Sequence, residues 1–158
     1  MIDELVDGFQ AALVGRDRAA FAQVCALDVH YEDPLTAGAV HGVDALGDHA
    51  AQLWVAFPDA TIERAGERLS DGRFVAAPVR LRGTHTGEVG DLPPTRRAVD
   101  LHAVLYCELD PPRLRLWRVR AFYDLYDAAV QLGVLPSHGG IGERALMLLR
   151  GFGLRSRS

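Results

Sequence analysis

The sequence predicts an α+β domain in which a curved sheet cups one largely apolar pocket against helices. Apolar residues recur at helical spacing through the first third of the chain. In the middle of the chain, apolar and polar residues alternate in stretches that are separated by turn residues. Helices followed by a meander of long strands are typical of an α+β fold. The 158 residues, of which 49% are hydrophobic, suit one domain with a substantial core.

The helices are expected in the first third of the chain and near residue 128. Spacing predicts an amphipathic helix from Ile2 to Leu13, and Asp17 can cap a second helix that carries Phe21 and Cys25. A third helix with one apolar face begins at residue 43 and ends at 57, because proline disfavours helix in the residue before it. A short helix passes through Ala128, and one more is expected near 144–149.

Strands are expected between these helices. A short extended stretch covers 29–35, and four long strands follow at 61–69, 74–85, 98–109 and 113–123. Asp71-Gly72 marks a hairpin turn, and a loop rich in glycine and proline spans 86–97. The odd positions of 98–109 are all apolar, whereas the even positions mix polar and large side chains. A curved sheet that cups a cavity explains this mixed face, and so does packing against another subunit.

Composition excludes several classes of function. A formal net charge of −4 argues against nucleic-acid binding, although arginines cluster locally. No apolar run is long enough to span a bilayer, and the acidic start lacks the order of a signal peptide, so a cytoplasmic protein that does not bind membranes is expected. Cys25 and Cys107 fall in apolar patterns and are interpreted as buried free thiols.

The chain contains none of the common motifs for metal, phosphate or dinucleotide sites. The remaining candidates are a histidine and two aspartates at strand ends. His85 falls on the same side of its predicted strand as the alternating apolar residues. It is therefore either a core histidine or a pocket group that exchanges protons. Asp124 is either a helix N-cap or a carboxylate at the pocket rim, and Asp33 before Pro34 is either a turn residue or a pocket residue.

Four segments together resemble the SnoaL-like polyketide cyclase family. They are DPLTAGAVHG at 33–42, FPDA at 57–60, GTHTGEVGDLPPT at 83–95 and FYDLYDAAVQLG at 122–133. The resemblance covers residues 1–136, so 137–158 is interpreted as a C-terminal extension. It implies the nuclear transport factor 2-like, or cystatin-like, fold: a cone formed by a curved antiparallel sheet wrapped around N-terminal helices. This expectation agrees with the pattern of elements.

The resemblance also implies chemistry without cofactor or metal, in which a carboxylate is acid and base during an intramolecular aldol ring closure. Asp124, in the D-x6-QLG segment, has the strongest claim to that role, and His85, in GTHTGE, is the next pocket residue. Further residues are expected only to line the substrate pocket: Asp33, Trp54, Phe57, His102, Arg120 and Tyr123. The sequence departs from many relatives in placing Trp117 seven residues before the aspartate instead of three.

Three functions remain open at this point. The first is a cofactor-independent acid–base enzyme that cyclises a polycyclic or polyketide-like ketone. The second is a cofactor-independent hydroxylase or epoxide hydrolase of the same fold, and the third is a non-catalytic module that binds small molecules. The expected partners are a small hydrophobic ligand and a second copy of the chain, bound through the open sheet face. Fold alone does not decide among the three functions.

Overall fold

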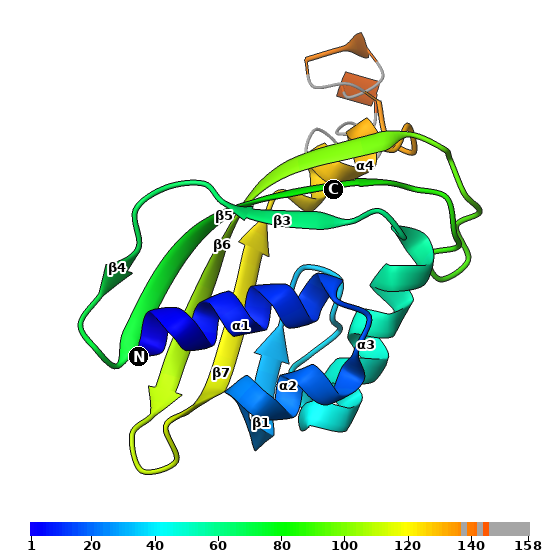
Figure 1. The fold of residues 1–158 in the computed structure, drawn as a ribbon. Coiled ribbons are helices and arrows are strands. Elements are labelled where there is room, and N and C mark those ends of the chain that lie inside the picture. The colour runs from blue at the N-terminus through cyan, green and yellow to red at the C-terminus, as the bar shows by residue number, and fades with distance from the viewer. Residues whose placement is uncertain (137–138, 142–143, 146–158) are drawn as a thin grey trace, which may run out of the picture.

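The computed structural model describes residues 1–136, 139–141 and 144–145. A strongly curved sheet forms one layer, and α1 (Ile2–Val14) lies across its concave face (Figure 1). Val6 and Phe9 of this helix are fully buried, as the helical spacing predicts. The expected α+β fold, with the sheet wrapped around the N-terminal helices, is therefore confirmed.

The second helix is shorter than expected. A 3-10 turn (Arg18–Ala20) is capped by Asp17, whose carboxylate accepts the Ala19 N–H at 2.9 Å. It leads into the single turn of α2 (Phe21–Val24), which ends because Cys25 is already extended and pairs with Leu116 in the sheet. Pairing with a distant strand thus overrides the local helical pattern.

The third helix is confirmed within one residue. α3 (Val43–Ala56) follows Gly42, whose φ of 89° favours glycine, and ends at Phe57 before a proline. Leu46 and Ala50 are fully buried and fix the inner face of this helix. The helix therefore presents a defined stripe of side chains toward the sheet.

In the described part of the chain the sheet contains seven strands, in the order β2-β1-β7-β6-β5-β3, and β4 pairs with β5. Their bounds are β1 (Cys25–Glu32), β2 (Val40–His41), β3 (Thr61–Arg64), β4 (Leu69–Ser70), β5 (Phe74–Thr84), β6 (Ala98–Asp110) and β7 (Arg115–Tyr123). The long hairpins agree with the predicted meander. The expected strand over 61–69 is instead divided, and Arg68 between its parts pairs with Asp3 and Asp7 on α1.

One pairing departs from an all-antiparallel meander. β1 lies parallel to β7, with Tyr31 opposite Val119 and Glu32 opposite Arg120. Parallel strands need a long connection, and here most of the chain separates the two. Because of this pairing, the end of β1, which carries Tyr31 and Asp33, lies beside the last long strand.

The two faces of the sheet differ as the sequence predicts. In β6, Val99, Leu101, Ala103, Leu105 and Cys107 are buried against the helices. The even positions from Ala98 to Tyr106 are exposed on the outer face. Cys25 and Cys107 are buried free thiols, and burial raises the pKa of each to about 12.

α4 (Leu125–Gln131) follows β7 and packs beside β6 (Figure 1). The predicted helix at 144–149 lies mostly outside the described residues. No helix in the described part of the chain is both long and apolar enough to cross a membrane.

Candidate functional site

The end of β1 carries a buried carboxylate whose lone pairs are all used. Oδ2 of Asp33 accepts a hydrogen bond from the Tyr31 hydroxyl at 2.9 Å and lies 2.6 Å from Nε2 of His49. Oδ1 accepts the backbone N–H groups of Leu35 and Thr36 at 2.7 and 3.1 Å. The Asp33 side chain is only 2% exposed. A carboxylate so fully occupied can orient a neighbour but offers a substrate no free lone pair.

The local sequence explains this arrangement. Asp33 precedes a proline, and its carboxylate closes a turn by accepting the N–H groups that follow, which is the usual behaviour of aspartate in turns. The Thr36 hydroxyl donates to the Asp33 carbonyl at 2.9 Å and fixes the same turn. Of the two interpretations of Asp33, the structure shows the turn and adds side-chain contacts, and its expected place in the substrate pocket stays a prediction.

His49 reaches Asp33 from the inner face of α3. It lies three residues after the buried Leu46 and four before Leu53, so it shares their side of the helix. Its side chain is 14% exposed, so the ring is mostly buried but can be reached from outside. His49 therefore lies between the interior and the surface.

Hydrogen bonding fixes which nitrogen of His49 carries the proton. Ionised Asp33 only accepts, so Nε2 of His49 must be the donor. Burial by itself raises the pKa of Asp33. The hydrogen bonds and electrostatic attraction of His49 and the hydrogen bond from Tyr31 outweigh burial and hold that pKa below its ordinary value. In neutral His49 the Nδ1 lone pair is left free, and no described residue bonds it.

His49 borders a cavity of about 220 Å³ between α3 and the 86–97 loop. Its other lining residues are Leu35, Gln52, Leu53, Val89 and Gly90. The N–H groups of Thr86 and Gly87 donate to the Ala56 carbonyl at 3.0 and 3.2 Å and fasten the loop to the end of α3. The cavity is thus mainly apolar, with a histidine and an amide as its polar groups.

Two tyrosines interact with Asp33, one through a hydrogen bond and the other electrostatically. Burial, reinforced by the charge of Asp33, raises the pKa of both Tyr31 and Tyr123, so both remain protonated at neutral pH. The Tyr31 hydroxyl is committed to Asp33, whereas no described residue bonds the Tyr123 hydroxyl. Tyr123 does not line the cavity beside His49, and its expected place in the substrate pocket stays a prediction.

His85 is fully buried, and its hydrogen bonds define its tautomer. Nδ1 accepts the Thr95 backbone N–H at 3.1 Å, so neutral His85 carries its proton on Nε2. That Nε2 is buried without a partner among the described residues. A buried donor without a partner costs about 1–3 kcal/mol. His85 thus offers a donor and not a base, and its role as a reacting group stays a prediction.

Asp124 occupies the N-cap of α4 and is exposed. Its Oδ1 accepts the Asp127 N–H at 3.0 Å, which is the capping alternative of the sequence interpretation. It does not line the cavity beside His49. Its proposed role as the acid–base carboxylate stays a prediction that a single substitution can test.

The other predicted lining residues lie apart from this cavity. The Trp54 indole N–H donates to the Leu13 carbonyl at 2.6 Å and packs on the main core. Phe57 lies against the His85 ring, with centroids 5.4 Å apart. His102 and Arg120 are exposed on the outer face, because the even positions of β6 and β7 point away from the helices. The structure does not bring them to this cavity, and their expected role in substrate binding stays a prediction.

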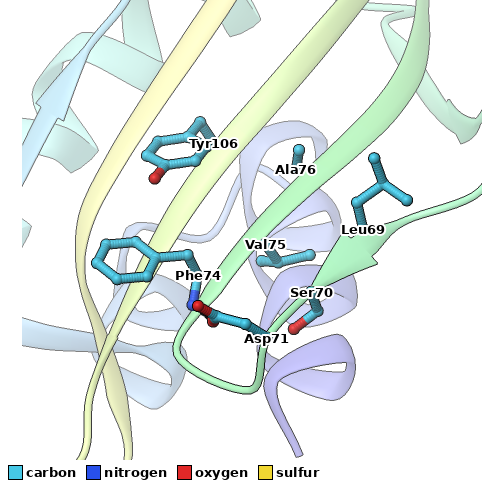
Figure 2. A pocket seen from close by; sticks show the side chains of 7 residues that line it. All are labelled: Leu69, Ser70, Asp71, Phe74, Val75, Ala76 and Tyr106. Carbon is cyan, nitrogen blue, oxygen red and sulfur yellow. Dashed lines mark hydrogen bonds between the residues drawn. The ribbon is translucent and has the colours of Figure 1, made fainter.

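A larger hollow of about 360 Å³ lies beside β4 and the following turn (Figure 2). Phe74 and Tyr106 stack along it, with centroids 6.0 Å apart, and Leu69 borders it from β4. Its one carboxylate, Asp71, accepts the N–H groups of Arg73 and Phe74 and closes the turn. This hollow offers no free base, so the smaller cavity is the stronger candidate site.

Sequence reasoning missed His49. The available signal was helical phase, because His49 shares the inner face with Leu46 and Leu53. Its pairing with Asp33 depends on how α3 folds back along β1 and could not be read from spacing. Among the described residues, no group of three or more His, Cys, Asp or Glu side chains could hold a metal ion.

Fold and site together define a class of protein: cone-shaped α+β domains with a mainly apolar cavity and a few inward polar groups. Within that class, the chain belongs to the SnoaL-like polyketide cyclase family, whose sequence profile matches residues 3–132. No curated protein matches the chain.

Several solved structures share the fold. A protein described as a SnoaL-like polyketide cyclase, from Jannaschia Sp. CCS1, is 20% identical with a TM-score of 0.74, covering 84% of this chain and 92% of that one. IdmH from Streptomyces antibioticus, described as a polyketide cyclase, is 24% identical with a TM-score of 0.69, covering 84% and 98%. AclR from Streptomyces galilaeus, described as a hydroxylase, is 20% identical with a TM-score of 0.71, covering 95% and 92%.

Proposed function

We propose that this protein is an acid–base enzyme that enolises a polyketide-like ketone and closes a ring by aldol addition, without a cofactor. The observation that carries the proposal is the Nε2 to Oδ2 contact of 2.6 Å between His49 and Asp33 at the edge of an apolar cavity. An Asp–His pair of this kind holds the imidazole in one tautomer and stabilises the imidazolium that forms. Nδ1 of His49 is then the base.

The reaction requires little beyond these residues. His49 removes a proton next to the carbonyl, and the enolate carbon attacks a second carbonyl of the same chain. The resulting alkoxide takes the proton back from His49, so atoms and electrons balance without an oxidant or reductant. A hydrogen-bond donor must stabilise the enolate oxygen. The side-chain amide of Gln52, which lines the cavity beside His49, is our candidate.

The lining supports a neutral, apolar substrate. Leu35, Leu53 and Val89 form most of the wall, and no arginine of the described residues lines the cavity. The volume of 220 Å³ is below the ~300–1,000 Å³ typical of sites for drug-sized ligands. One ring or acyl end of a polyketide-like ketone fits this space, and the remainder would extend outside it.

Proton exchange tests the proposal without knowledge of the product. Ketones from acyclic diketones to polycyclic anthracycline-like precursors are incubated with enzyme in D₂O, and loss of α-proton signals is followed by NMR. Exchange by wild type should fall roughly 10²–10⁴-fold in His49→Gln, the usual worth of a positioned base. Asp48→Asn is the matched control, because Asp48 precedes His49 on α3 but is exposed and pairs with Arg18.

The outcomes separate the remaining alternatives. Exchange that is equally fast in His49→Gln would contradict the assignment of the base. An absence of exchange with turnover of epoxides would favour the hydrolase alternative. Tight binding of ketones without exchange would favour the non-catalytic module.

A further inference from the structure

The outer face of the sheet carries a pair of histidines on neighbouring strands. His30 of β1 and His41 of β2 are directly opposite each other in the antiparallel register. Their ring centroids are 4.3 Å apart, and the rings meet edge to face at 79°. Residues directly opposite on one face of a sheet have neighbouring Cβ atoms, so the closeness of the rings follows from the register.

Both imidazoles are available as ligands. No described residue forms a hydrogen bond with either ring, and His41 is exposed while His30 is half-buried. The Trp117 ring lies 5.7 Å from His30 and restricts it on one side. Two imidazoles on one metal ion, each with a metal–nitrogen distance of ~2.0–2.1 Å, have centroids roughly 4.5–5 Å apart. The observed centroid distance of 4.3 Å is close to this spacing, and the edge-to-face rings have to rotate about their side-chain bonds before both lone pairs can meet one ion.

The charges around the pair are mixed. Asp28, two residues before His30 on the same strand, interacts with it electrostatically and is held by Arg113 at 2.5 Å. Arg118 is opposite His30 across the β1–β7 pairing, and its guanidinium lies over Trp117 at 4.7 Å. The cation Arg118 disfavours hard ions held by charge alone. The site therefore suits borderline ions that prefer imidazole nitrogen.

We propose that His30 and His41 form a binding site for a divalent transition-metal ion such as Zn²⁺, Cu²⁺ or Ni²⁺. The two imidazoles supply the protein ligands and water completes the coordination, since no third metal-binding side chain joins them in the described residues. The site lies on the outer face, whereas His49 and Asp33 face the interior. It is therefore independent of the proposed enzymatic reaction.

Metal binding would tie the short edge strand β2 to β1. β2 contains only Val40 and His41, and the Gly42 N–H donates to the Val29 carbonyl at 2.8 Å just beyond it. A metal cross-link adds a contact in the folded state that the unfolded chain lacks, so it stabilises this corner. Slower hydrogen exchange of the β2 amides is the expected signature.

Titration of tag-free protein with Zn²⁺ and Cu²⁺ by calorimetry tests the site. One ion should bind per chain. His30→Gln and His41→Gln should each weaken binding by at least the roughly 10–100-fold that loss of a supporting partner costs in metal sites. His102→Gln is the matched control, because His102 lies on the same face opposite Arg80, without a histidine across from it.

Hydrogen exchange supplies a second readout. Zn²⁺ should slow exchange at Val40 and His41 in wild type and in His102→Gln, but not in His41→Gln. Circular dichroism of the exposed His41 variant checks that it folds. Unchanged affinity in both His30→Gln and His41→Gln, or no binding to wild type at a hundredfold excess of ion, would overturn the proposal.

Discussion

His49 on α3 and Asp33 at the end of β1 are 16 residues apart in the chain, yet Nε2 of one lies 2.6 Å from Oδ2 of the other. Asp33 accepts three further hydrogen bonds, from Tyr31, Leu35 and Thr36, and is thereby fixed in place. Any change in this carboxylate should therefore affect both the stability of the fold and the orientation of His49.

Asp33→Asn should destabilise the protein and reduce its activity. The asparagine amide keeps an oxygen for Leu35 and Thr36, but its NH₂ cannot accept from Tyr31 and His49. Leaving the buried Tyr31 hydroxyl without its acceptor costs about 1–3 kcal/mol, measured by urea unfolding. His49 must also accept from the new NH₂, which moves its proton to Nδ1 and removes the base. Tyr31→Phe is the control, since it removes one donor and leaves His49 in place. Wild-type activity in Asp33→Asn would contradict an orienting role.

The contribution of Asp33 to stability should depend on pH. Its folded pKa lies below the ordinary 3.8, so the unfolded chain binds this proton first as pH falls. The stabilisation is fully present above pH ~5 and is lost as pH falls through 3.8 toward the lower folded pKa. Unfolding curves of wild type and Asp33→Asn between pH 3 and 7 should therefore converge at the acid end. A constant difference across that range would show that the folded pKa of Asp33 is not lowered.

Asp124→Asn decides between the two interpretations of Asp124. Asparagine caps helices about as well as aspartate, so the melting temperature should hardly change. Because Asp124 is exposed and bonded to the Asp127 N–H, we also expect exchange activity near that of wild type. A fall of roughly 10²–10⁴-fold with an unchanged melting temperature would instead make Asp124 the acid–base group.

The outer sheet face should mediate a homodimer. Val104, Tyr106 and Phe122 are exposed apolar residues on this face. Light scattering should give wild type a mass twice the 17.2 kDa of one chain. Val104→Asp should have the mass of a monomer, because the substitution places a charge in the interface. Leu114→Asp is the control, since Leu114 is exposed in a turn at φ 51°, which aspartate tolerates. A monomeric wild type would refute the expectation.

The sequence alone determined the fold class, α1, α3, the long hairpin of β6 and β7 and the inward phase of β6. These features rest on periodicity and turn chemistry, which act over a few residues and so can be read along the chain. The resemblance in four segments added the family, and with it the expectation that the sheet forms a cone around the N-terminal helices. Local patterns also offered a turn for Asp33 and a cap for Asp124, each beside a functional alternative that they could not decide.

Only the tertiary structure decided which of these groups meet. The parallel pairing of β1 with β7 joins strands separated by most of the chain, and it brings Asp33 close enough to Tyr123 to affect its pKa. The fold of α3 against β1 brings His49 to Asp33, and the register of β2 brings His41 to His30. Such contacts depend on long-range packing and strand register, for which no short stretch of sequence carries a signal, whereas a cap or a turn is complete within its own few residues.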